Sequence, residues 1–380
     1  MNKPKIRFKG FEGEWKDSML SDFSYSICSG RDTAHKGIYP LYGSTGIIGT
    51  TNKPSYNGAM LLVARVGANA GKLQIINEEC GVSDNTLIIK PNGNISVSWL
   101  YYYLVHCNLN HLVYGSGQPL ITGYMLKRIP ILLGSKKECD EIASYFTSLD
   151  AQIAASTSRL SSLKQIKAAS LLNMFPQKGE TVSRVRFKGF QGEWKKVKIG
   201  DVAPLTGGFA FQSGQFKTSG VPIIRISNIL SSGIVGGDFV YYNEFKGDSE
   251  FRLYKGDVVI AMSGATTGKV ATFEANDFGY QNQRVGKFSR TNLVNYELLS
   301  KLVSAPNFQK KIISKLTSSA QPNASSKDID SIDLVVPEET EEQRAIASYF
   351  TTLDAQITLH RKRLEKLKQI KAACLEKMFA

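Results

Sequence analysis

The chain carries the same sequence frame twice. Residues 5–16 read Lys-Ile-Arg-Phe-Lys-Gly-Phe-Glu-Gly-Glu-Trp-Lys, and residues 184–195 repeat nine of these twelve with conservative changes at the other three. Residues 142–153 return almost unchanged as 346–357, and both copies are followed by Leu-Lys-Gln-Ile-Lys-Ala-Ala. The stretches between these frames are similar in length but share little sequence. We therefore predict one architecture used twice, in which the frame holds the molecule together and the divergent filling selects a target.

The second part of the frame predicts a long helix in each half of the chain. Its apolar residues occupy the a and d positions of four heptads, which indicates a coiled coil. About 32 residues at 1.5 Å each extend over roughly 48 Å. Lys167 and Lys371 interrupt the apolar stripe and lower its predicted strength. The residues predicted to form the coiled coil or to contact a partner are Phe146, Leu149, Ile153, Leu160, Leu163, Phe350, Leu353, Ile357, Leu364 and Leu367.

The predicted fold class is α+β, with two mixed α/β modules at residues 1–134 and 184–337. In both modules short apolar runs alternate with Gly, Asn and Ser. The repeated helical segments 135–175 and 338–380 come after the modules, and 176–183 is a polar linker. Strands are predicted at Met60–Ala64, Leu87–Ile89, Val221–Ile226 and Asp257–Ala261, and shorter helices at Ser98–Asn110 and Tyr296–Leu316.

Connectivity predicts how the two long helices pair. The second module starts where the first long helix ends and finishes where the second begins, and the ends of a compact module usually lie close together. The helices are therefore expected to be antiparallel, with one module at each end and an approximate two-fold axis between the halves. Phe379 ends the chain where its counterpart Phe175 continues into the linker, so Met1–Lys5 resembles that linker cut open and the repeat is circular.

Charge indicates a polyanionic partner. Lys and Arg exceed Asp and Glu by 47 − 33 = 14, and division at Gly179 gives +7 (19 − 12) before and +7 (28 − 21) after it. The excess belongs to the repeated unit and not to a tail, which favours nucleic acid over a merely soluble basic protein. The long helices are also basic, so they are not expected to neutralise each other, and an acidic partner surface or DNA is expected beside them.

Other features exclude several classes of protein. No apolar run approaches the roughly 20 residues that cross a bilayer, and the N-terminus lacks the apolar segment of a signal peptide. The five cysteines are scattered without a CxxC pair, which is typical of reduced thiols in a cytoplasmic protein. The four histidines lack metal-ligand spacing, and no adenine-methyltransferase or nuclease signature is present. A binding protein with no catalytic residue and no metal site is predicted.

A Gly-Ala-x-x-Gly-Lys motif occurs at Gly67–Lys72 and again at Gly264–Lys269. A phosphate-binding loop needs four residues between its glycines and Ser or Thr after its lysine, and neither copy meets these requirements. A turn between two strands is the favoured interpretation. Whether the lysine of this turn contacts DNA phosphate stays open. The rival interpretation is a nucleotide-dependent enzyme, which nucleotide binding by the chain would support.

Polar, basic and aromatic residues of the two fillings differ, as reading two sequences requires. Arg pairs with guanine and Asn or Gln with adenine in the major groove, but each residue alone could equally be a turn or strand-end residue. The DNA-binding candidates are Ser44, Thr45, Arg65, Asn69, Lys72 and Asn85 in the first module, and Phe209, Gln212, Arg225, Ser227, Asn228, Ser263, Thr266, Lys269, Gln281, Asn282 and Arg284 in the second.

On these motifs the chain resembles, over nearly all its length, the specificity subunit of a type I restriction–modification system. The resemblance rests on the duplicated helix and entry frames and on Gln118-Pro119 and Gln321-Pro322, which lead to Ile129–Ile131 and Ile332–Leu334. Tyr39–Gly43 and Gly220–Arg225 also resemble target-recognition domains of that family.

The resemblance implies two target-recognition domains that read the halves of a bipartite, asymmetric double-stranded DNA site. The helices would set the gap and dock two methyltransferase subunits, to which motor-nuclease subunits attach. AdoMet, ATP and Mg²⁺ would be used by those partners, and no site for them is expected here. A coiled-coil scaffold without DNA specificity and a recognition subunit that serves only a methyltransferase remain as alternatives.

Overall fold

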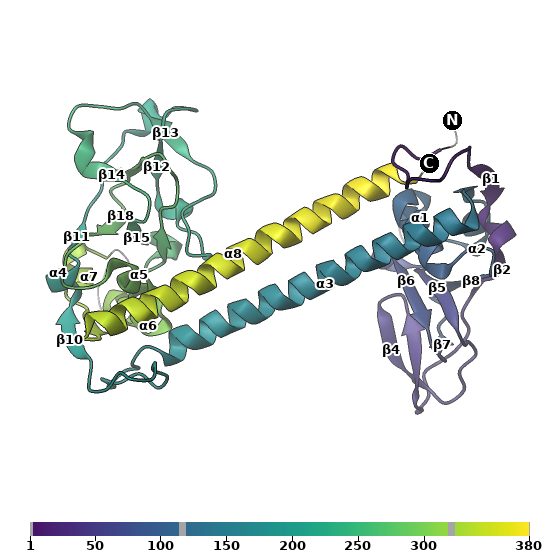
Figure 1. Ribbon diagram of the computed structural model, residues 1–380, viewed down its shortest axis with the longest axis horizontal. Helices are drawn as coiled ribbons and strands as arrows, with labels where there is room; N and C mark the ends of the chain where they lie inside the picture. The colour runs from purple at the N-terminus through teal and green to yellow at the C-terminus, as the bar shows by residue number, and fades with distance from the viewer. Residues whose placement is uncertain (1–2, 114–118, 318–323, 380) are drawn as a thin grey trace. The chain divides into compact units, whose positions relative to one another are not determined.

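The structure, a computed structural model, describes residues 3–113, 119–317 and 324–379. It divides into two compact units, Met1–Arg159 with His360–Ala380, and Leu160–Leu359. Both units contain a module and segments of the two long helices, α3 (Lys136–Asn173) and α8 (Thr340–Lys377) (Figure 1). The division therefore falls inside the helices and not at the predicted module ends, because each module packs against segments of both. Among the described residues, no helix has the length and apolar character needed to span a membrane.

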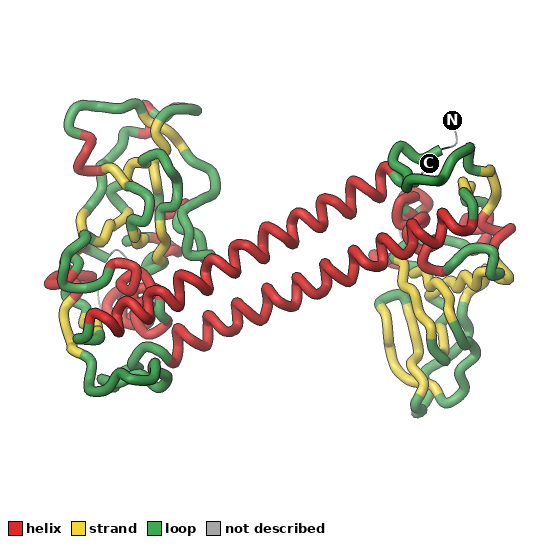
Figure 2. The backbone as a smooth tube through the Cα atoms, in the orientation of Figure 1, coloured by secondary structure: helices red, strands yellow, loops and turns green. Residues whose placement is uncertain are grey.

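The first unit mixes helices and sheets, as predicted (Figure 2). Its elements besides α3 and α8 are β1 (Lys16–Met19), η1 (Leu20–Phe23), β2 (Ser24–Ser29), β3 (Tyr39–Gly43), β4 (Gly46–Thr51), β5 (Ala59–Ala64), η2 (Gly67–Asn69), β6 (Leu73–Asn77), β7 (Gly81–Val82), β8 (Thr86–Pro91), α1 (Val97–Cys107), η3 (Leu109–Leu112), α2 (Gly123–Lys127) and β9 (Pro130–Leu133). The sheets have the orders β2-β8-β5-β6, β4-β3-β7 and β1-β9. Strands β3 and β7 run parallel, and every other pair is antiparallel.

The second unit has the same kind of architecture. Its elements are β10 (Lys195–Lys198), α4 (Ile199–Val202), β11 (Leu205–Thr206), η4 (Ser213–Gln215), β12 (Val221–Ile224), η5 (Ile226–Asn228), β13 (Val240–Tyr242), η6 (Asp248–Phe251), β14 (Arg252–Leu253), β15 (Val258–Ala261), η7 (Gly264–Thr266), β16 (Val270–Thr272), β17 (Gly279–Gln281), β18 (Val285–Phe288), α5 (Tyr296–Ser304), α6 (Pro306–Thr317), α7 (Ser326–Asp330) and β19 (Asp333–Val336). Its sheets have the orders β11-β18-β15-β16, β13-β12-β17-β14 and β10-β19, with β12 and β17 parallel.

The chain segments at the ends of the long helices repeat one backbone contact in the two units. In the first unit the amide of Ile6 donates to the carbonyl of Lys377, near the end of α8 (2.9 Å). In the second, the amide of Val185 donates to the carbonyl of Asn173, at the end of α3 (2.9 Å). The equivalent residues Ile6 and Val185, each at the start of a module, thus make the same contact with the end of one long helix.

One predicted helix is wrong. The segment Tyr296–Leu316 is not continuous but forms α5 and α6, with extended backbone at Ala305 between them (φ −67°, ψ 145°). Proline has no amide hydrogen, and its ring disfavours helical backbone at the residue before it. Pro306 therefore ends α5 and begins α6. Of the sequence segments that carried the resemblance, Gln118 and Gln321-Pro322 lie outside the described residues.

Candidate nucleic-acid interface

In the first module the loops after β3, β5 and β7 lie side by side. The amide of Ser83 donates to the Tyr42 carbonyl (2.9 Å), and the amide of Arg65 donates to the Asn85 carbonyl (2.9 Å). These bonds join loops that are up to 40 residues apart in the chain, since β3 ends at 43 and β7 at 82. The fold thus groups predicted DNA-binding residues that the sequence separates: Ser44, Thr45, Arg65 and Asn85.

Two residues of this group border a small hollow together with a lysine. Ser44, Thr45 and Lys72 line a hollow of about 50 Å³. The Arg65 Nη1 donates to the Asp84 carbonyl (3.3 Å), while its buried Nε finds no acceptor among the residues that the structure describes. Lys72 and Asn85 are exposed, and Asn69 is half-buried.

The first of these strands is held by a tyrosine beneath the surface. Burial, with Glu78 as hydrogen-bond acceptor, raises the pKa of Tyr42 to about 12. Its hydroxyl therefore stays protonated near neutral pH and donates to the Glu78 Oε1 (2.5 Å). This bond anchors β3, and Ser44 and Thr45 come directly after that strand.

Both Gly-Ala-x-x-Gly-Lys motifs are strand-to-strand turns, which confirms the sequence interpretation. Each links the antiparallel strands of a hairpin, β5 with β6 and β15 with β16. The first and last glycines have positive φ, 76° at Gly67 and 89° at Gly71 in the first copy, a conformation that L-residues adopt at a cost. A strand comes after each motif, whereas a phosphate-binding loop opens a helix. The Lys269 Nζ donates to the Ser231 hydroxyl (3.2 Å), within the module.

The same strand ends meet in the second module. The amide of Asn282 donates to the Ile224 carbonyl (3.1 Å), and the amide of Met262 donates to the Arg284 carbonyl (2.9 Å). The buried Nε of Arg225, like that of Arg65, finds no acceptor within the described parts of the chain. The candidates that are exposed or half-buried around these ends are Gln212, Arg225, Ser227, Thr266, Lys269, Asn282 and Arg284, whereas Ser263 is buried.

Two predicted base-contacting amides are instead used inside the second module. Asn228 is 1% exposed, and its Nδ2 donates to two carbonyls in the loop 236–238 (3.1 and 2.9 Å). Gln281 is 0% exposed, and its Nε2 donates to the carbonyls of Thr206 and Val285 (2.8 Å each). Because Asn and Gln pair with adenine, the sequence suggested that these two amides contact bases. In this conformation they instead hold loops and strands together, because buried polar groups require hydrogen-bond partners.

Phe209 is likewise a packing residue in this structure. Its ring centroid lies 4.9 Å from that of Phe211, 5.0 Å from that of Phe245 and 5.1 Å from that of Phe251. Aromatic pairs at these distances contribute stability beyond their buried area. Sequence reasoning singled it out within a Gly-rich segment, where two of its packing partners, Phe245 and Phe251, lie more than 30 residues away and could not be seen.

The predicted frame residues of the long helices are mostly buried. Phe146 stacks on Phe379 in the first unit (centroids 5.8 Å apart, 15° between planes). Phe350 stacks on Phe175 in the second (5.7 Å, 13°). Both stacks join a helix segment to the segment that ends the other long helix. Buried members of the predicted set are Phe146, Leu149, Leu160, Leu163, Phe350, Leu353, Ile357 and Leu364, while Ile153 and Leu367 are half-buried.

Ion pairs between the helices correct the expectation that the two could not neutralise each other. In the first unit Lys371 pairs with Asp150 (2.5 Å), and in the second Lys167 pairs with Asp354 (2.6 Å). The lysines that interrupt the heptads therefore face aspartates of the partner helix. In both units the helix segments run antiparallel, since later residues of α3 contact earlier residues of α8.

A buried ion pair at each module entrance was missed by sequence reasoning. Glu138 is 1% exposed and accepts from Arg7 (2.5 and 2.8 Å) and from the Trp15 indole (3.1 Å). In the second unit Arg186 makes the same pair with Glu342 (2.7 Å). The available signal was that Arg7 recurs as Arg186, and that a glutamate stands four residues before Ile142 and again before Ile346.

Comparisons with known proteins agree with this architecture. The family described as "Type I restriction modification DNA specificity domain" matches residues 12–165 and 191–369. The type I restriction enzyme MjaVIII specificity subunit of Methanocaldococcus jannaschii is 23% identical over 94% of this chain and 90% of its own length.

Solved structures share the fold. The S subunit of a type I restriction-modification system from M. genitalium has a TM-score of 0.70 at 15% identity, over 100% of this chain and 99% of its own. A structure concerned with complex assembly and conformational transition of the type I R-M system has a TM-score of 0.52 at 14% identity, over 98% and 99% of the two chains.

Proposed function

The chain belongs to the family of type I restriction modification DNA specificity domains, and from this premise we propose that its two modules read the two halves of a bipartite DNA site. The net charge of +14, shared equally between the halves, supports a DNA partner. Each module would read its half-site with the loops at the ends of its converging strands.

The observation that carries this proposal is a shared backbone with different side chains. Arg65 and Met262 occupy equivalent positions, since each comes directly after the first hairpin strand and donates its amide to the loop opposite. The facing positions hold Asn85 in one module and Arg284 in the other. One scaffold thus presents arginine from opposite loops in the two modules. Arginine and asparagine distinguish base pairs in the major groove, so such a difference would give the two modules different targets.

The long helices have a separate role in the proposal. We propose that α3 and α8 form an antiparallel coiled coil with an approximate two-fold axis, which sets the distance between the half-sites. Support comes from the matching aromatic stacks and Lys–Asp pairs of the two units. The exposed basic residues of both helices would dock two methyltransferase subunits, to which motor-nuclease subunits attach.

The chain is proposed to have no catalytic activity of its own. AdoMet, ATP and Mg²⁺ are assigned to the partner subunits. In the described residues no group of three or more His, Cys, Asp or Glu side chains is arranged to hold a metal ion. The proposed contribution of this chain is therefore the choice of DNA site, which operates in a cytoplasmic complex.

The test is methylation of a randomised DNA library by the chain together with its methyltransferase subunit. Arg65→Ala is expected to relax one half-site and Arg284→Ala the other, because a bidentate arginine–guanine contact contributes about 1–3 kcal/mol to discrimination. Arg184→Ala, an exposed arginine of the frame paired with Glu180, is the matched control and should leave both half-sites unchanged. Relaxation of both half-sites by either module variant would refute the modular assignment.

Exchange of residues 1–134 for the corresponding module of another family member gives a second test. One half-site should change completely while the other is retained. Methylation or nucleotide hydrolysis by the chain alone would contradict the assignment of catalysis to its partners.

A further inference from the structure

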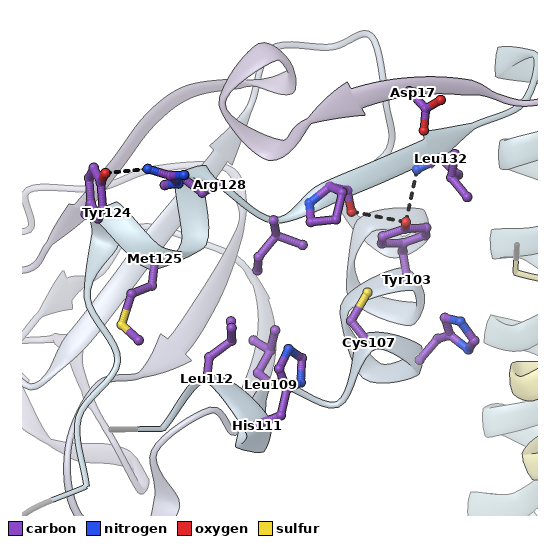
Figure 3. A pocket seen from close by; sticks show the side chains of 13 residues that line it. Asp17, Tyr103, Cys107, Leu109, His111, Leu112, Tyr124, Met125, Arg128 and Leu132 are labelled. Carbon is purple, nitrogen blue, oxygen red and sulfur yellow. Dashed lines mark hydrogen bonds between the residues drawn. The ribbon is translucent and has the colours of Figure 1, made fainter. Parts of the chain in front are cut away.

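The first module contains hollows of contrasting size and lining. One of about 590 Å³ lies beside α1, η3 and α2 and is lined mostly by apolar side chains, among them Leu109, Leu112 and Met125 (Figure 3). Another, of about 50 Å³, lies against the turn between β3 and β4. Sites for organic ligands usually have about 300–1,000 Å³, whereas one water molecule needs about 10–15 Å³. The small hollow therefore has room for a single polyatomic ion or a few water molecules.

The polar side chains of the small hollow can all donate hydrogen bonds. Ser44 and Thr45 form the turn after β3, Lys72 and Gln74 stand at the start of β6, and Thr86 begins β8. Of the described residues that line the hollow, only Lys72 is charged, and none carries a carboxylate. Hydroxyl and ammonium donors bind phosphate oxygens through short, charge-assisted hydrogen bonds. The lining therefore favours an oxyanion over a cation.

Thr86 is buried in the wall of this hollow with its hydroxyl unpaired. The residue is 1% exposed, and its Oγ1 has no hydrogen-bond partner among the residues that the structure describes. Its side chain lies on the same face of β8 as that of Ile88, which packs in one core cluster with Tyr42 of β3. A buried hydroxyl without a partner is destabilising relative to an apolar group of the same shape.

The second module shows that the scaffold does not need this hydroxyl. Thr86 pairs with Ala64 as Val285 pairs with Ala261, so Thr86 and Val285 are equivalent. Both amides also donate to the carbonyl three residues earlier (3.1 and 2.9 Å). Valine has the shape of threonine without the hydroxyl. The strand thus forms with either residue, and the Thr86 hydroxyl is free to bind a ligand.

The lysines of the two Gly-Ala-x-x-Gly-Lys turns differ in their partners. Lys269 donates to the Ser231 hydroxyl (3.2 Å), which lies in the connection 225–239 between β12 and β13. In the first module the equivalent connection is only the turn 44–45. Lys72 is exposed and has no acceptor within the described parts of the chain. Its ammonium group is therefore free to neutralise an anion that enters the hollow from outside.

We infer that this hollow binds one phosphate group of the DNA backbone. The inference rests on the proposed function, because it places DNA on the face of the module that carries Ser44 and Thr45. Lys72 supplies the positive charge, and the hydroxyls of Ser44, Thr45 and Thr86 donate hydrogen bonds to the phosphate oxygens. Phosphate contacts fix the position of a protein on DNA without distinguishing bases. These four residues are thus assigned to positioning the DNA and not to reading its sequence.

The test measures DNA binding by the full chain together with its methyltransferase subunit. Two fluorescent duplexes are compared, one with the methylated site and one with a scrambled sequence. Thr86→Val is expected to weaken binding of both about ten-fold, since a hydrogen bond to a charged group is lost. Thr86→Ser keeps the hydroxyl and is the matched control, which should bind as the parent does. Because Val285 occupies the equivalent position, Thr86→Val should be no less stable than the parent in urea unfolding.

Salt dependence separates the charged donor from the neutral one. Lys72→Gln should weaken binding of both duplexes and reduce the slope of log Kd against log salt concentration by about 0.9, because one phosphate is no longer neutralised. Thr86→Val should leave this slope unchanged, since a hydroxyl carries no charge. Lys178→Gln, which changes an exposed lysine of the linker, is the control with no expected change in slope.

A neutral methylphosphonate, placed in turn at each backbone position of the site, locates the phosphate. At one position the parent should lose affinity, and neither Thr86→Val nor Lys72→Gln should lose more there. Unchanged binding by Thr86→Val would show that its hydroxyl bonds only to water and would overturn the inference. Losses confined to the site duplex, or methylphosphonate effects that both variants leave unaltered, would also overturn it. Equal affinity of the parent for the two duplexes would instead refute the proposed reading of sequence, while the variants still decide the phosphate contact.

Discussion

At the scale of single residues, the frame is held by charged pairs that recur in both units. Arg7 with Glu138 and Arg186 with Glu342 connect the start of each module to the first turns of a long helix. Glu138 and Glu342 are 1% exposed, so removal of either arginine would leave a buried charge without its partner, which is strongly destabilising. These requirements explain why both members are identical in the two copies.

Asp354 carries a prediction at this scale, because it pairs with both Lys167 (2.6 Å) and Lys301 (2.8 Å). Burial raises its pKa, but the two lysines lower it more, so its pKa lies below the ordinary value. A carboxyl with a depressed pKa stabilises the folded state above its unfolded pKa of about 3.9, and this stability is lost as pH falls through the lower folded pKa.

Asp354→Asn should therefore lower the free energy of unfolding by about 1 kcal/mol at pH 7, since the pair is about one-third exposed. The difference from the parent should shrink toward zero as pH falls through the lowered pKa of the folded state. Urea unfolding monitored by tryptophan fluorescence at several pH values measures it. Glu365→Gln, an exposed acid on the same helix, is the control with no expected effect. An equal loss at pH 7 and in acid would show that charge is not the cause.

At the scale of elements, the hairpin turns explain a motif that resembles a nucleotide site. Each turn needs positive φ at its two glycines, and the intervening residues form one 3₁₀ turn, η2 or η7. The lysine amide donates back to the carbonyl three residues earlier, at 2.9 Å in both copies. Backbone geometry alone therefore accounts for Gly-Ala-x-x-Gly-Lys and its recurrence.

Gly67→Ala is predicted to destabilise the first module by about 1–2 kcal/mol, the usual strain of an L-residue with left-handed backbone. No atom lies within 4 Å of the added Cβ, so the loss measures backbone strain alone. Gly67→Asn should cost less, because asparagine tolerates this conformation better. Gly207→Ala is the matched control, with equal space but no positive φ, and should be neutral or slightly stabilising in urea unfolding. Equal losses at Gly67 and Gly207 would contradict this explanation.

At the scale of the whole molecule, duplication gives each unit the same set of parts, a module and segments of both long helices, taken from different stretches of the chain. The first unit combines a module with the start of α3 and the end of α8. The second combines the end of α3 with a module and the start of α8. Since both helices contribute to both units, a change in helix length is expected to act on the pair of modules together.

Insertion of four residues after Lys164 and, in the same protein, after Lys368 tests the proposed spacing role. Four residues add about 6 Å of helix and rotate the distal part of the helix by roughly 40° beyond a full turn. Because base pairs are about 3.4 Å apart, the preferred gap should lengthen by one or two base pairs while the half-sites stay the same. Methylation of a library with every gap length is the measurement.

The same four residues inserted after Gly179, in the linker, provide the control and should leave the gap unchanged. A single insertion is expected to act less cleanly than the pair, because a stutter in one helix can be absorbed by slippage against the other. An unchanged gap in the doubly extended, assembled complex would show that the helices hold partners but do not measure DNA.

The sequence by itself determined the duplication, the two long helices, the mixed modules and the turn at each Gly-Ala-x-x-Gly-Lys motif. Heptad periodicity and glycine chemistry act over a few neighbouring residues, so a single chain displays them directly. Only the tertiary structure decided that Asn228 and Gln281 are buried and that Lys167 and Lys371 face aspartates. The physical reason is that a polar side chain's burial and its partner depend on residues that can be more than two hundred positions away, which only the folded chain brings together.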